Sequence, residues 1–134
     1  MYSGHCLCGD IRFEFDAPDR DVNICHCSLC RRMTGTAFGT YVKVREDALH
    51  FRSSENRFIG YAVTDKLTMI SCASCGSYLY ATHSDYPAFA YVCLGVVDDN
   101  DDLRPTYHEF VGSRAPWYEI HDDLPQYDGW SDED

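Results

Sequence analysis

The clearest pattern along the chain is the alternation of apolar and polar residues between positions 10 and 15. Ile11, Phe13 and Phe15 fall on one face of an extended segment and charged residues on the other, which is the period of a half-buried strand. Further runs rich in β-branched and aromatic residues predict strands at 37–44, 48–52, 57–63, 66–71, 78–82, 88–96 and 104–110. The sequence therefore predicts a mainly β protein built from antiparallel strands.

Helices are expected to be few, at most one or two short ones. Residues 28–34 form the one clear candidate, with Ser28 as the N-cap and Gly35 where the helix would stop. A length of 134 residues predicts one domain spanning 1–134. The acidic tail near 126–134 is expected to fray.

The charge balance narrows the possible partners. A formal net charge of -11 repels phosphate backbones and anionic membrane surfaces, so we expect neither nucleic acid nor membrane as a partner. The longest apolar run, 88–97, is half of the roughly 20 residues that a membrane helix needs. The first residues carry neither a basic flank nor an apolar stretch, so we expect a cytoplasmic protein with reduced thiols.

Seven of the eight cysteines fall into three closely spaced groups. Two thiolates a few residues apart can coordinate one zinc ion. A glycine directly after a ligand allows the turn to adopt a positive φ. Two such groups supply the four ligands of a closed structural zinc site. The predicted set is Cys6, Cys8, Cys72 and Cys75, with Gly9 and Gly76 following the second cysteine of each pair.

The third group, Cys25, Cys27 and Cys30, has three thiolates and no fourth. Three protein ligands and a vacant position are typical of catalytic zinc, so these cysteines are predicted to form an open, catalytic zinc site. The vacant position can take water or a substrate thiol. His26, Arg31 and Arg32 are the candidate substrate contacts, and the arginines would also offset thiolate charge.

Structural alternatives exist for several of these residues. Cys93 could complete the triplet as a closed site, or be a buried, inert side chain. His26 could face solvent or a backbone carbonyl, and the arginines could be ordinary solvated helix residues. The other histidines, His108 among them, are expected at the surface or at sheet edges. A set of aromatic residues is assigned to the core rather than to a binding wall: Phe38, Tyr41, Phe58, Tyr61, Tyr78 and Tyr80.

The order of these motifs resembles the glutathione-dependent formaldehyde-activating enzyme family, also called the centromere protein V family. The resemblance rests on Gly4-x-Cys6-x-Cys8-Gly9, Cys25-His26-Cys27-Ser28-x-Cys30-Arg31-Arg32 with Gly35, and Cys72-x-x-Cys75-Gly76. The carboxyl end, with Ser113-Arg114-Ala115-Pro116-Trp117 and Asp123-Leu124-Pro125, is similar to the pattern that closes many members.

This resemblance implies an Mss4-like β fold and two zinc ions on the cysteine sets already described. It also implies a carbon-sulfur lyase type of activity, in which glutathione and formaldehyde form or release S-hydroxymethylglutathione. An anionic thiol such as glutathione would need nearby arginines, for example Arg31, Arg32 or Arg57. The alternative hypotheses are a non-catalytic, zinc-stabilised protein-binding module and, less favoured, a redox or metal-storage protein.

Overall fold

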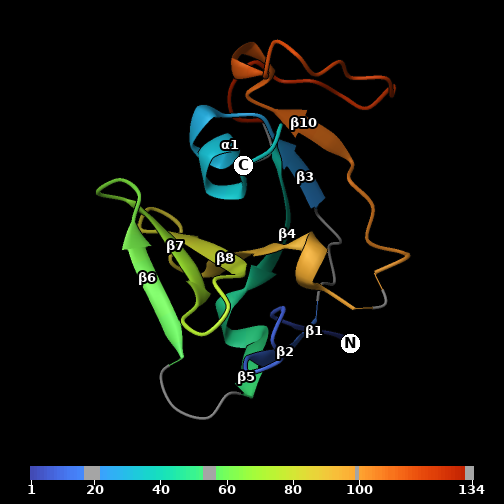
Figure 1. Cartoon of the computed structure of the whole chain (residues 1–134). Helices are drawn as coiled ribbons and strands as arrows, with labels where there is room; N and C mark the ends of the chain where they lie inside the picture. The colour runs from blue at the N-terminus through green and yellow to red at the C-terminus, as the bar shows by residue number, and fades with distance from the viewer. Residues whose placement is uncertain (17–21, 53–56, 99, 132–134) are drawn as a thin grey trace.

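The computed structural model describes residues 1–16, 22–52, 57–98 and 100–131, which form two β-sheets and one α-helix (Figure 1). The helix α1 covers Ser28–Thr34. The strands are β1 Tyr2–His5, β2 Arg12–Phe15, β3 Val22–Cys25, β4 Gly39–Arg45, β5 Leu49–Arg52, β6 Phe58–Ala62, β7 Leu67–Cys72, β8 Tyr78–His83, β9 Phe89–Cys93 and β10 Tyr107–Glu109. Three single-turn 3₁₀ helices also occur in the described residues, at Glu46–Ala48, Leu94–Val96 and Val111–Ser113.

The predicted mainly β architecture is confirmed. The smaller sheet has the order β1-β2-β5 and the larger one the order β10-β3-β4-β9-β8-β7-β6. Within the described ranges every strand pair is antiparallel except β10 with β3. That parallel pair joins segments more than 80 residues apart, a distance over which an alternating pattern specifies no partner.

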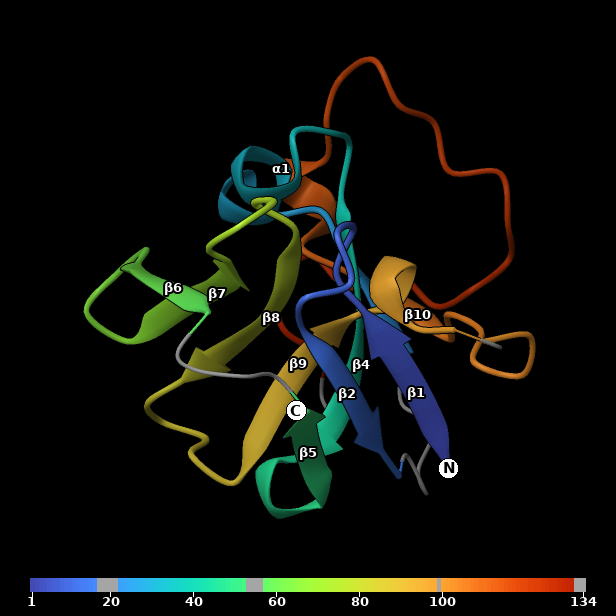
Figure 2. The same ribbon diagram turned by 60° about the horizontal axis from the view of Figure 1, so that its bottom comes forward.

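The main apolar core lies between the two sheets (Figure 2). Phe13 and Phe15 of β2 are almost fully buried while Arg12 is exposed, as the alternation at 10–15 predicts. Val42 and Val44 of β4 meet them from the larger sheet. The core thus holds the turn after β1 against the larger sheet, which brings the first cysteine pair toward the third.

Helix α1 begins and ends at the predicted residues, but its N-cap is Cys27, not Ser28. The Cys27 sulfur accepts a hydrogen bond from the backbone N–H of Cys30 at 3.2 Å. A thiolate can satisfy a free N–H at a helix start as serine does. Gly35 ends the helix with φ 73°, as expected.

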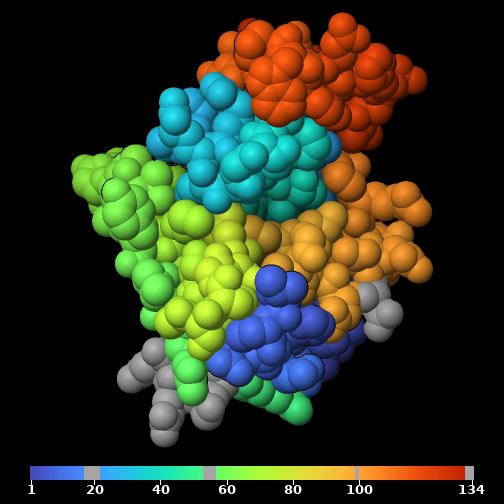
Figure 3. All heavy atoms as spheres, in the orientation of Figure 1, coloured from blue at the N-terminus to red at the C-terminus, as the bar shows by residue number. Residues whose placement is uncertain are grey.

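The C-terminal segment returns to β10 and lies beside α1 (Figures 1 and 3). The backbone N–H of Tyr127 donates to His108, and that of Phe110 donates to Gly129. Ser131 is 5% exposed. Fraying stays a prediction for residues 132–134, which lie outside the described residues. None of the helices in the described ranges has the length and apolar character that crossing a membrane requires.

Candidate metal centres and active-site cavity

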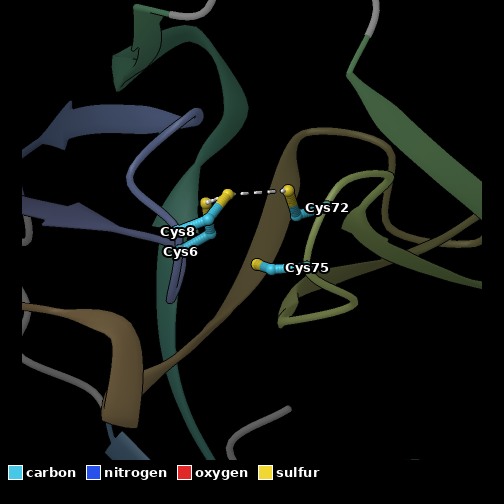
Figure 4. Close-up of side chains that lie close together, drawn as sticks. All are labelled: Cys6, Cys8, Cys72 and Cys75. Carbon is cyan, nitrogen blue, oxygen red and sulfur yellow. Dashed lines mark hydrogen bonds between the residues drawn. The ribbon is translucent and has the colours of Figure 1, made fainter.

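The first cysteine cluster joins the turn after β1 to the end of β7 and the turn that follows (Figure 4). The sulfur atoms of Cys6, Cys8, Cys72 and Cys75 all lie within 4.8 Å of one another. The Cys6 and Cys8 sulfurs are 3.5 Å apart, and those of Cys8 and Cys72 are 3.9 Å apart. Zn–S bonds of ~2.3 Å in a tetrahedron separate the sulfurs by about 3.8 Å, so this donor set fits zinc.

Backbone N–H groups point at the sulfurs of this cluster. Ile11 donates to Cys6 at 3.4 Å, and Ser74 donates to Cys72 at 3.3 Å. Such bonds favour the thiolate that a metal needs. Gly76 has φ 79°, the left-handed conformation that this turn requires and that glycine adopts without strain.

The second cluster gathers Cys25 at the end of β3 with Cys27 and Cys30 at the start of α1. Their three sulfurs also lie within 4.8 Å of one another. Cys93, on β9 opposite Tyr41, is half-buried nearby but does not belong to this group. Each of the two clusters can therefore hold a metal ion, one with four sulfurs and one with three.

The pKa values of the three thiols in the triplet explain why this group is suited to binding a cation. Contacts with Cys25 and Cys30 lower the pKa of Cys27 to about 3. Contacts with Cys27 and Cys30, together with burial, raise the pKa of Cys25. Without a metal the negative charge thus gathers on one sulfur, and three thiolates side by side require a cation such as zinc to coexist.

The triplet opens onto a cavity of about 280 Å³. All three cysteines line it, together with polar side chains that include Asn23 and Lys43. The described lining residues do not include His26, Arg31 or Arg32, and Arg57 instead contacts Asp10 and Ser74 beside the first cluster. Aromatic side chains form a large part of the wall: Tyr41, Tyr78, Tyr86, Tyr91, Tyr107, Phe110 and Trp130.

Comparison with known proteins decides the family. A family model described as "glutathione-dependent formaldehyde-activating enzyme" matches residues 1–113, which include all seven clustered cysteines. The chain belongs to this family. A search of curated proteins found no match.

One solved structure shares the fold of this member of the formaldehyde-activating enzyme family. It is the crystal structure of a Rhodobacter sphaeroides protein, determined as a structural genomics target. The two chains are 22% identical over 72% of this chain and 88% of the other, with a TM-score of 0.60. This likeness concerns the fold alone.

The cysteine motifs of the family did not reveal two tyrosines that support the triplet. The Tyr41 hydroxyl donates to the Cys30 sulfur at 3.4 Å, and the Tyr78 hydroxyl donates to Tyr41 at 3.2 Å. Burial raises the pKa of both phenols, so both remain donors. Gly39 leaves the space that the Tyr41 ring occupies. Both tyrosines were predicted to belong to the core, and they also line the cavity.

His26 lies between two of the family's cysteines, but its ring joins a buried histidine pair. It is 0% exposed, and its Nε2 lies 2.8 Å from Nδ1 of His108. Nε2 of His108 is 3.1 Å from the Asp122 carboxylate. Burial, with the charges of His108 and Arg114, lowers the pKa of His26 to about 4. His108 was expected at the surface or at a sheet edge; it lies on the edge strand β10 but is buried. No local pattern reveals the histidine pair, because the two residues are 82 positions apart.

Proposed function

We propose that this protein is a zinc-dependent enzyme of the carbon-sulfur lyase type that forms or breaks the adduct of a small thiol with an aldehyde. Glutathione and formaldehyde, named in the family description, are the first pair to test. The observation that carries the proposal is the position of Cys25, Cys27 and Cys30 on the wall of a cavity. The four-sulfur cluster has a full set of ligands, whereas the triplet leaves a position for substrate.

The reaction needs no oxidant or reductant. The substrate thiol gives up its proton, and its sulfur forms a bond to the carbonyl carbon of the aldehyde. The π electrons of the C=O bond move to oxygen, which takes up a proton, giving a hydroxyalkyl thioether; the breakdown reaction is the reverse. A zinc ion on the three cysteines would favour the thiolate form of a thiol placed beside it.

The chain's own residues have three tasks in this scheme. The three cysteines hold the metal at the wall of the cavity. The Tyr41 hydroxyl donates a hydrogen bond to the Cys30 sulfur and so stabilises one thiolate ligand. The aromatic wall limits water near the reacting carbonyl. Because both clusters require reduced thiols, the proposal includes a reducing compartment such as the cytoplasm.

The test combines metal content with thiol binding. Elemental analysis should find two zinc ions in the wild type, one in Cys27→Ser and two in Cys93→Ser, the matched control from the same neighbourhood. Cobalt in the triplet should change its visible spectrum when glutathione or a neutral thiol is added. NMR should then show faster adduct formation or breakdown with the zinc protein than without it.

Two results would contradict the proposal. If Cys93→Ser also lost a zinc, the second site would be closed by a fourth cysteine and would have no position for substrate. If a fully loaded protein left the cobalt spectrum and the adduct rates unchanged with every thiol, a non-catalytic binding module would be the better hypothesis.

A further inference from the structure

One wall of the cavity comes from the C-terminal segment, beyond the residues that match the family model. Trp130 lines the cavity and packs edge-on against Phe110, with ring centroids 4.9 Å apart. The next residue, Ser131, donates its backbone N–H to a Glu109 carboxylate oxygen at 2.6 Å. The Trp130 ring is therefore held at a defined place in the wall.

The cavity offers little that would bind a multiply charged ligand. Among its described lining residues, the charged side chains other than the cysteines are Lys43 and Glu109. One oxygen of Glu109 accepts from Asn23 at 2.7 Å and the other accepts from Ser131. Both oxygens are already engaged in holding the wall together.

Lys43 is the one lysine or arginine among the described lining residues. Its ammonium nitrogen lies 4.5 Å from the ring centroid of Phe89, which is not among the described lining residues. His83 accepts a hydrogen bond from the Asp85 backbone on Nδ1, as an uncharged imidazole can. Glutathione carries carboxylates at both ends, and the described lining residues offer no matching pair of cations.

We propose that the thiol recognised by this protein is uncharged and carries a flat apolar group, which packs against Trp130 and the neighbouring tyrosine rings. This inference rests on the proposed function, because the sulfur of that thiol would meet the triplet. Aromatic faces bind flat apolar groups well. A cavity of about 280 Å³ lies at the small end of ligand sites, which suits a thiol with one ring.

The experiment compares 2-phenylethanethiol with glutathione on the protein loaded with zinc and, separately, with cobalt in the triplet. The cobalt spectrum gives the affinity of every variant. The chain has two tryptophans, so Trp130 fluorescence in Trp117→Phe provides a second measurement wherever Trp130 is kept. We expect 2-phenylethanethiol to bind at least tenfold more tightly than glutathione. We expect Trp130→Ala to weaken the aromatic thiol about tenfold, equal to about 1.4 kcal/mol, and to leave glutathione within about twofold.

Two further variants separate the role of the ring from a general disturbance. Trp130→Phe keeps an aromatic face and should retain most of the affinity. Trp117→Ala removes a tryptophan of similar exposure that does not line the cavity, and it should change nothing. Trp130 is 59% exposed, so its truncation leaves the core intact.

The outcomes distinguish this inference from the function on which it rests. A cobalt spectrum that responds to glutathione at equal or lower concentrations than to 2-phenylethanethiol would overturn the inference and keep the function. Tighter binding of the aromatic thiol with no loss in Trp130→Ala would overturn the role of Trp130. A triplet indifferent to both thiols would overturn the function and the inference together.

Discussion

Replacing Tyr41 by phenylalanine tests whether the tyrosine pair supports the metal site or only the core. The ring of Tyr41 is 5% exposed, and phenylalanine keeps its packing. The substitution removes the hydrogen bond to the Cys30 sulfur at 3.4 Å and the one that Tyr78 makes to the Tyr41 oxygen at 3.2 Å. Two neutral hydrogen bonds of about 0.5–1.5 kcal/mol each predict a loss of about 1–3 kcal/mol from the free energy of unfolding of the metal-free protein.

The effect on metal affinity follows from the charge of the acceptor. In the zinc-loaded protein Cys30 is a thiolate, and a hydrogen bond to a charged group contributes about 1.5–3 kcal/mol. The loaded protein therefore loses about 1 to 1.5 kcal/mol more than the free one, which weakens the second zinc roughly fivefold to tenfold. This lies near the lower end of the roughly 10- to 100-fold typical of residues that support a metal ligand.

Competition with a chromophoric chelator measures both zinc ions in one titration, and the four-cysteine cluster serves as the internal standard. Tyr78→Phe is the matched control, because it leaves the bond from Tyr41 to Cys30 in place. It should lower the free energy of unfolding with little change in zinc affinity. Equal loss of zinc affinity in both variants, or unchanged affinity in Tyr41→Phe, would refute the reasoning.

Three other substitutions test separate parts of the molecule. Cys72→Ser should remove one zinc ion and lower the Tm sharply, because a structural zinc contributes on the order of 10 kcal/mol of apparent folding free energy. A variant that still binds two zinc ions and melts at the wild-type Tm would contradict this. Gly39→Ala places a Cβ about 2.7 Å from ring carbons of Tyr41, so urea titration should show a loss of about 1–3 kcal/mol and chelator competition a weaker second zinc. His108→Leu leaves the buried His26 without its 2.8 Å partner and should cost about 1–3 kcal/mol by urea titration; a change under about 0.5 kcal/mol would show that the pair adds nothing to stability.

Local patterns were enough to predict the elements that carry their own signal. Alternation predicted β2, and the expected cap at Ser28 with the stop at Gly35 predicted α1 with its observed bounds. Strand β1, Tyr-Ser-Gly-His, has no apolar alternation, and β3 runs directly into the cysteine motif, so neither was expected. These two strands are stabilised by pairing with β2 and β4, not by a strand pattern in their own sequences.

The cysteine groups were predictable because ligand spacing is a local property. The seven cysteines in the spaced groups are the same seven that the structure brings together in two clusters. The tyrosine pair and the histidine pair were not predictable, since each depends on residues brought together only by the fold. A buried tyrosine on a strand has the same sequence signal whether its hydroxyl meets a sulfur or a backbone carbonyl.

Two of the parts of the chain that line the cavity are the cysteine motifs and the C-terminal segment that carries Trp130. The thiolates come from motifs whose spacing is fixed by the geometry of a metal ion, and they lie within residues 1–113. Trp130 comes from a later segment, which is attached through Glu109 and through backbone hydrogen bonds to β10. A wall attached in this way can change its side chains without disturbing the metal ligands. Under the proposed function, residues around 130 are therefore where the thiol preference of this protein should be sought.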